Sequence, residues 1–215
     1  MFVGHFAAGL AAKAAEPKAP LFLYIAASQF MDWGWSGLVL AGVEHFRMAP
    51  TLPGSPLDLY DMPWTHSLPG ALAWSVAGGA IAKYLFKVPT RAAAFVGAAV
   101  FSHWGLDLLV HRPDLEVWPG GPRLGFGLWN HPVPEMIVEM GLLAFAALFW
   151  SAQRTREGRS TWTAGLFLSG LVLVQYISVA LPKDGPPQGM ALSALATYLI
   201  VTALAWLLDR KPASL

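Results

Sequence analysis

The sequence predicts an all-α fold: a polytopic bundle of transmembrane helices that forms a single integral membrane domain over residues 1–215. The chain is 55% hydrophobic and only 13% charged, whereas soluble globular domains carry roughly 25% charged residues. Apolar stretches close to the ~20 residues that cross a bilayer as a helix recur along the chain. Because backbone polar groups in lipid must be hydrogen-bonded within the segment, and the alternation typical of a barrel is absent, these stretches are predicted to be helices.

Six stretches are expected to span the membrane. They cover residues 20–42, 65–86, 92–111, 133–150, 161–181 and 190–208, and a shorter helix over 1–15 precedes them. Proline and glycine residues mark the breaks between them. The segment 1–15 lacks the basic residues that open a secretory signal peptide, so we expect it to be retained as a helix about half a membrane long.

The distribution of Lys and Arg predicts the orientation of the bundle. Cytoplasmic loops carry an excess of these residues. One side of the predicted topology holds ten of them: Lys13, Lys18, Lys83, Lys87, Arg91, Arg154, Arg156, Arg159, Arg210 and Lys211. The other side holds four: Arg47, Arg112, Arg123 and Lys183. We therefore expect a bacterial inner (cytoplasmic) membrane protein with its N-terminus outside, its C-terminus in the cytoplasm, and the loops 43–64 and 112–132 outside.

Composition also limits the chemistry available to the chain. The formal net charge is +1, so no basic surface indicates nucleic-acid binding. The absence of cysteine removes disulfides, iron–sulfur clusters and thiolate metal sites. Any metal ion must then be held by His and carboxylate ligands, which suit zinc first, with manganese or iron as alternatives.

Ionisable residues inside the apolar stretches form the functional signal. Asp32 lies within the stretch 20–42, and His103 and Asp107 lie within 92–111, four residues apart and so on one helix face. His5 and His66 are expected at the same outer depth of the membrane. An intramembrane charge costs roughly 2.5–3.5 kcal/mol on insertion scales, and a shared divalent cation would neutralise the carboxylates. These five residues are predicted metal ligands.

A further group begins the stretch 133–150. His131, Glu135 and Glu139 repeat the four-residue spacing. The two glutamates are candidates for a second metal site or a general base, and His131 and Glu135 are the predicted catalytic acid–base residues.

Other interpretations of these residues stay open. A His at a helix end is often interfacial, which is the preferred interpretation for His45, and His111 is as well explained by a helix cap or a headgroup position. A buried Asp could pair with a basic residue, of which Arg112 is the nearest candidate to Asp107. Chains of Asp and His also build proton or ion relays.

Two segments resemble the YdjM-like family of membrane-bound metal-dependent hydrolases. They are Thr65-His66-Ser67-Leu68 and Ser102-His103-Trp104-Gly105-Leu106-Asp107, preceded by a match to the family's N-terminal His at His5 and to its acidic stretch at Asp32. The resemblance covers roughly residues 1–111. Where the family has the first His of its His-x-x-x-x-His motif this chain has Asp61, so the resemblance adds Asp61 to the predicted metal ligands. The family's second Asp and its Arg-Gly pair are not matched; Met62-Pro63 stand where the latter would be.

The family is in turn similar to zinc-dependent phospholipase C, which holds zinc with His and carboxylate pairs at the spacings of His103/Asp107 and His131/Glu135. The resemblance implies a hydrolase that acts on a phosphoester or lipid-type substrate at the outer leaflet, in contact with the lipid bilayer. The alternative expectation is a protein without enzymatic activity: an accessory subunit of a larger membrane complex, or an ion or metal carrier.

Overall fold

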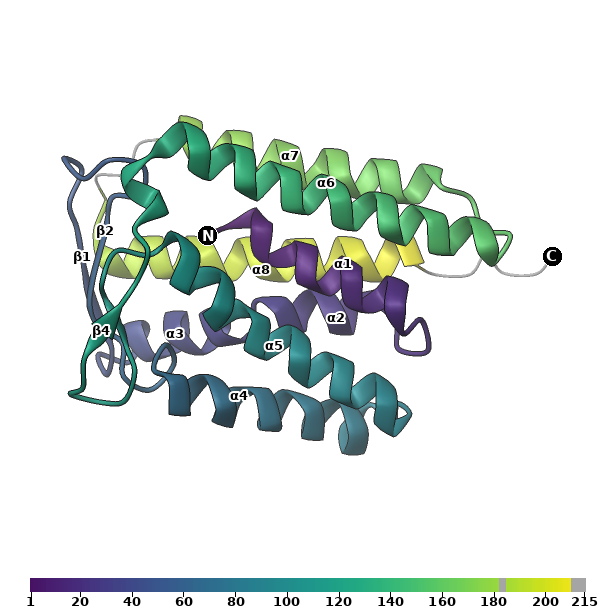
Figure 1. Ribbon diagram of the computed structural model, residues 1–215, viewed down its shortest axis with the longest axis horizontal. Coiled ribbons are helices and arrows are strands. Elements are labelled where there is room, and N and C mark those ends of the chain that lie inside the picture. Colours follow the sequence, from purple (N-terminus) through teal and green to yellow (C-terminus); the bar gives the residue numbers. More distant parts are fainter. Residues whose placement is uncertain (182–184, 210–215) are drawn as a thin grey trace.

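The computed structural model describes residues 1–181 and 185–209, which form a helical bundle with two β-hairpins at one end (Figure 1). The helices are α1 (Phe6–Ala15), α2 (Leu21–Ser28), α3 (Phe30–Leu40), α4 (Leu68–Ala80), α5 (Thr90–Val110), α6 (Pro132–Arg156), α7 (Trp162–Ala180) and α8 (Pro187–Asp209). Shorter turns are the 3₁₀ helices η1 (Val3–His5) and η3 (Leu128–Asn130) and the π-helical segment η2 (Ile81–Leu85).

The two long connections fold into hairpins. Strand β1 (His45–Met48) pairs antiparallel with β2 (Leu57–Asp61), and β3 (Leu115–Glu116) pairs with β4 (Arg123–Leu124). Figure 1 places both hairpins at the same end of the bundle, which is the arrangement expected for loops on one side of a membrane.

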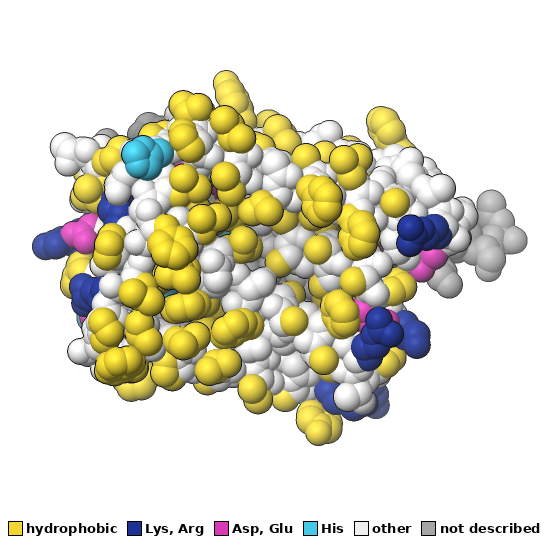
Figure 2. Space-filling view, in the orientation of Figure 1, with side chains coloured by type: hydrophobic (Ala, Val, Ile, Leu, Met, Phe, Trp, Pro, Cys, Tyr) yellow, Lys and Arg dark blue, Asp and Glu magenta, His cyan; other side chains and the backbone are white. Residues whose placement is uncertain are grey.

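Four helices, α5 to α8, are long and apolar enough to cross a membrane, which gives the described chain the character of an integral membrane protein. Their outward faces are apolar: Val133, Phe145, Val179 and Leu199 are exposed. Figure 2 shows hydrophobic side chains over the middle of one face, with Lys and Arg gathered toward its two ends. The expected number of six spans is not confirmed.

The predicted span 20–42 is interrupted and forms α2 and α3. At Gln29 the backbone leaves the helical region, with φ −118° and ψ 9°. The carbonyl of Ser28 accepts a hydrogen bond from the ring of His103, 2.9 Å away, and the Gln29 side chain donates to the carbonyl of Phe2. Partners from elsewhere in the fold satisfy polar groups at the break, so the interruption can be held inside the bundle.

The predicted span 65–86 begins later and ends irregularly. Ser67 caps α4 by accepting a hydrogen bond from the backbone N–H of Gly70, and Pro69 lies in the first turn. After Ala80 the helix continues as the π-helical η2, and Lys87 then adopts a positive φ of 56°. The α-helical part is 13 residues long, well short of the ~20 needed for a span.

Helix α1 lies inside the bundle between α2, α5 and α6 (Figure 1). Phe6 and Leu10 are fully buried in a core that also takes side chains from α2, α6, α7 and α8. Gly9 allows α1 to approach α2, because a Cβ at that position would lie 2.7 Å from the carbonyl oxygen of Tyr24. This central position brings the turn η1, which precedes α1, against α5.

Candidate metal centre

Six ionisable side chains meet in the interior of the bundle, close to the end that carries the hairpins. They come from η1 (His5), α3 (Asp32), the residue two before α4 (His66), α5 (His103 and Asp107) and the cap of α5 (His111). Asp32 is the most accessible, with 15% of its side chain exposed, whereas the other five side chains are nearly inaccessible. The expected convergence of His5, Asp32, His66, His103 and Asp107 is therefore observed, and His111 joins them.

The Nε2 atom of each imidazole faces a carboxylate. In Asp107, Oδ1 lies 3.0 Å from His5 Nε2 and 3.3 Å from His111 Nε2, and Oδ2 lies 3.1 Å from His103 Nε2 and 3.5 Å from His66 Nε2.

Asp32 joins the same group through two of these rings. Its Oδ1 lies 3.4 Å from His103 Nε2 and 3.5 Å from His66 Nε2. Its Oδ2 accepts a hydrogen bond of 2.8 Å from the hydroxyl of Tyr198 on α8, which fixes the orientation of the carboxylate.

The Nδ1 atoms of three imidazoles are held by acceptors on the far side of the ring. His103 Nδ1 lies 2.9 Å from the carbonyl oxygen of Ser28, and His111 Nδ1 lies 2.8 Å from Asp114 Oδ1. A carbonyl or carboxylate oxygen only accepts, so Nδ1 carries the proton in both rings. The neutral ring then presents the lone pair of Nε2 to the centre.

His66 is held in the same way through a hydroxyl. Thr65 Oγ1 lies 2.7 Å from His66 Nδ1 and 2.7 Å from Glu44 Oε2. Since the Glu44 carboxylate accepts, the hydroxyl donates to Glu44 and accepts from His66. Backbone N–H groups of Trp64 and Thr65 donate to Glu44 Oε1, so the buried carboxylate has partners on both oxygens.

In their neutral tautomers, the Nε2 lone pairs of His66 and His103 therefore face carboxylate oxygens, whereas His5 Nε2 is hydrogen-bonded to Asp107 Oδ1 at 3.0 Å and its Nδ1 has no partner. His103 Nε2 and Asp107 Oδ2 are buried and make no hydrogen bond. The nitrogen–oxygen separations of 3.0–3.5 Å match the edge of a coordination shell with metal–ligand bonds near 2.0–2.1 Å, in which adjacent ligand atoms lie about 3.0–3.4 Å apart. The donors form two sets of three, His5/His103/Asp107 and Asp32/His66/His103. Within each set, the three ligand atoms lie within 4.8 Å of one another. The donor set fits a divalent cation.

The centre has few basic partners, and a buried glutamate fixes the turn that carries His5. Among the described residues, no Lys or Arg forms an ion pair with Asp32 or Asp107, although the N-terminal ammonium of Met1 pairs with Asp107 Oδ1 at 3.2 Å. Glu139 on α6 is buried and accepts hydrogen bonds from the backbone N–H groups of Phe2 and Gly4, which fixes η1 and with it His5.

His111 follows the last residue of α5. Burial disfavours its imidazolium, but the carboxylates of Asp107 and Asp114 outweigh this effect and raise the pKa of His111, so a cation at Nε2 would bind in competition with a proton. Of the two interpretations left open for His111, the helix cap applies, since its backbone ends α5, but its side chain also belongs to the centre.

Three predicted site residues lie elsewhere. Asp61 is at the end of β2, where its half-exposed carboxylate pairs with His45 Nδ1 at 2.7 Å. The hairpin register places His45 opposite Asp61, so the carboxylate is directed to its neighbouring strand and is in neither donor set. His131 is exposed at the cap of α6, and Glu135 is partly buried in the first turn of that helix; neither belongs to the donor sets.

Several residues that complete the site were not predicted. They are Ser28, Glu44, Thr65, Asp114 and Tyr198. Thr65 precedes a predicted ligand and Asp114 lies three residues after His111, and these local spacings were the available signals. Ser28, Glu44 and Tyr198 are far from their partners in sequence.

The chain was compared with protein-family models, curated proteins and solved structures, and none of them matches it. The resemblance to the YdjM-like hydrolases thus remains a prediction that rests on the short segments quoted above.

Proposed function

We propose that this protein is a membrane-bound metal-dependent hydrolase, with a divalent cation, zinc first, held among His5, Asp32, His66, His103 and Asp107. One observation carries the proposal. The rings of His66 and His103, with protonated Nδ1 atoms, direct their Nε2 lone pairs at Asp32 and Asp107. Among the described residues no Lys or Arg pairs with either carboxylate, and the N-terminal ammonium of Met1 pairs with Asp107 alone. Such an arrangement of acceptors is stable when a cation lies between them.

The chemistry follows from the ligand types. A divalent cation at such a site would act as a Lewis acid and would lower the pKa of water toward neutrality, supplying a hydroxide nucleophile at physiological pH. Asp32 is the most accessible of the carboxylates and would hold the cation through Oδ1. Tyr198 holds the other oxygen of Asp32 and keeps this carboxylate oriented.

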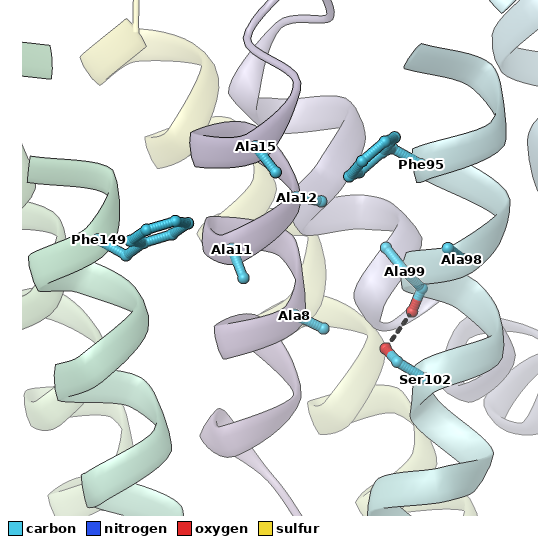
Figure 3. Close-up of a pocket in the computed structure, with 9 residues that line it drawn as sticks. All are labelled: Ala8, Ala11, Ala12, Ala15, Phe95, Ala98, Ala99, Ser102 and Phe149. Atoms are coloured by element: carbon cyan, nitrogen blue, oxygen red, sulfur yellow. Dashed lines mark hydrogen bonds between the residues drawn. The ribbon is translucent and has the colours of Figure 1, made fainter. Parts of the chain in front are cut away.

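An apolar groove beside the centre supports a lipid-type substrate. The groove has a volume of about 300 Å³ and lies between α1, α5 and α6; its lining residues are Ala8, Ala11, Ala12, Ala15, Phe95, Ala98, Ala99, Ser102 and Phe149 (Figure 3). The Ser102 hydroxyl donates to its own helix at Ala99. One end of the groove, at Ala8 and Ser102, is within one helical turn of His5 and His103. An acyl chain in this groove would end within one helical turn of two of the candidate ligands.

The outer leaflet is proposed as the place of reaction because of the charge distribution. The centre lies near the hairpin end, where Arg47, Arg112 and Arg123 are found. Basic residues at the opposite end include Lys13, Lys83, Arg154 and Arg159. Lys183, Arg210 and Lys211 lie outside the described residues. By the positive-inside rule the richer end is cytoplasmic.

The test is metal-dependent turnover. Purified protein is stripped with a chelator, reloaded with Zn²⁺ or Mn²⁺, and assayed on phospholipid vesicles and on a chromogenic phosphodiester. We expect turnover only with metal, a loss of at least 100-fold in His66→Ala, and little change in the matched control His45→Ala. Turnover that survives without metal, or no turnover on either substrate with a loaded centre, contradicts the proposal.

A further inference from the structure

The carboxylate of Asp107 lies between two different sets of imidazoles. Its Oδ1 is within 3.3 Å of Nε2 atoms from His5 and His111, and its Oδ2 is within 3.5 Å of Nε2 atoms from His66 and His103. The two oxygens of one carboxylate point in different directions, so a single ion bound at Oδ2 would leave the imidazoles at Oδ1 unused.

The rings of His5 and His103 are stacked in a way that one ion does not produce. Their centroids lie 3.7 Å apart and their planes differ by 5°. Two imidazoles on one zinc-like ion point at a common centre, and bond lengths near 2.0–2.1 Å then place their ring centroids about 4.5 Å apart or more. Parallel rings at 3.7 Å instead direct their Nε2 atoms at two neighbouring points. That spacing matches the ~3.5–4 Å between the ions of two-metal sites.

We infer that the centre binds two divalent cations bridged by Asp107. The first ion takes Asp32 Oδ1, His66 Nε2, His103 Nε2 and Asp107 Oδ2. The second takes His5 Nε2, His111 Nε2 and Asp107 Oδ1. The inference rests on the proposed metal centre and not on its hydrolytic activity.

The surrounding charges fit this occupancy. Two carboxylates, Asp32 and Asp107, belong to the centre itself. Two more hold its imidazoles from behind: Asp114 directly at His111, and Glu44 through Thr65 at His66. Together these four carboxylates supply four negative charges, which balance two divalent cations. Each ion also has one imidazole whose Nδ1 is fixed by an acidic side chain, the arrangement found at protein metal sites.

The experiment is metal counting on the full-length protein in detergent. The chain is stripped, titrated with Mn²⁺ alone, freed of unbound metal, and measured by elemental mass spectrometry and by electron paramagnetic resonance. We expect two equivalents and the spectrum of a spin-coupled Mn²⁺ pair. His66→Ala and His111→Ala should each retain one equivalent with an uncoupled spectrum, and the control His45→Ala should retain two.

The inference is overturned if the saturated wild type holds only one equivalent of Mn²⁺. That result is expected if the Met1 nitrogen occupies the position of the second ion at Asp107 Oδ1. Loss of both ions from His111→Ala also overturns it. Where that variant is not monodisperse, His111→Gln replaces it, because the amide retains a hydrogen-bond donor toward Asp114. Two equivalents without hydrolysis contradict the proposed function alone, whereas one equivalent with hydrolysis contradicts the ion pair alone.

Discussion

His103 donates its Nδ1 proton to the carbonyl oxygen of Ser28, 2.9 Å away, at the point where the helical run 21–40 is interrupted. The break and the candidate metal centre are therefore one structural feature. The interruption frees a backbone acceptor, and that acceptor fixes the tautomer of a ring on α5. Non-helical backbone within a membrane bundle is tolerated where the protein itself satisfies it, and here the satisfying group is a candidate metal ligand.

The Thr65 hydroxyl links His66 to Glu44, and its removal should weaken metal binding. Thr65→Ala leaves His66 Nδ1 without its acceptor and Glu44 without one of its donors. Loss of such outer partners lowers metal affinity roughly 10- to 100-fold. Thr65→Ser, which keeps the hydroxyl, should bind within a few-fold of wild type. Competition with a chelating dye measures both affinities, and equal affinities for Thr65→Ala and wild type would contradict the relay.

Asp61 should be dispensable for metal binding. The structure pairs it with His45 on the surface of the first hairpin, and exposed ion pairs contribute only about 0–1 kcal/mol to stability. Asp61→Ala should therefore keep the full metal content, whereas Asp32→Ala should lose the ion that Asp32 would hold. Elemental analysis of the two variants decides the matter, and metal loss from Asp61→Ala would restore the prediction made from the sequence resemblance.

Filling the groove beside the centre should discriminate between substrates. Ala98 is exposed and lines the groove, and Ala94, one turn earlier on α5, is equally exposed but does not line it. Ala98→Phe should raise the KM for a long-chain phospholipid roughly tenfold and leave hydrolysis of a short chromogenic phosphodiester unchanged. Ala94→Phe is the control for both substrates. Equal effects of Ala98→Phe on the two substrates would show that no acyl chain uses the groove.

Close packing of α4 against α5 should make Gly97 sensitive to substitution. A Cβ at Gly97 would lie 3.1 Å from the carbonyl oxygen of Ser75, whereas a Cβ at Gly141 on α6 meets nothing within 4 Å. Ser75 also donates to the carbonyl of Gly97 at 2.7 Å. Overpacking typically costs about 1–3 kcal/mol. Gly97→Val should therefore lower the melting temperature in detergent by several degrees, and Gly141→Val should not; equal melting temperatures would refute the close contact.

The long helices could be predicted from the sequence because apolar length alone determines them. Helices α5, α7 and α8 lie within three residues of the predicted boundaries, and α6 extends six residues beyond its predicted end. The interruption at Gln29 could not be predicted, since no proline or glycine marks it in Ala26-Ala27-Ser28-Gln29-Phe30. Its stabilising partners, His103 and the Phe2 carbonyl, come from distant parts of the chain.

The candidate ligands could be predicted because ionisable residues are rare and costly in apolar stretches. That reasoning found Asp32, His103 and Asp107. It could not find Glu44, which lies in a loop where an acidic residue is unremarkable. Asp61 was added by the family resemblance, and the pairing of β1 with β2, which turns Asp61 toward His45, could not be predicted because it depends on contacts across the hairpin.

The most direct test of the central claim is the metal content of the purified protein, wild type beside His103→Ala and Asp107→Ala, by elemental mass spectrometry. We expect zinc, manganese or iron in the wild type, loss of all metal from Asp107→Ala, and loss from His103→Ala of at least the ion that His103 would hold, with His45→Ala unchanged. A monodisperse wild type that binds no metal after reloading would contradict the account, because the facing imidazoles and carboxylates would then be a proton-sharing network and not a metal centre.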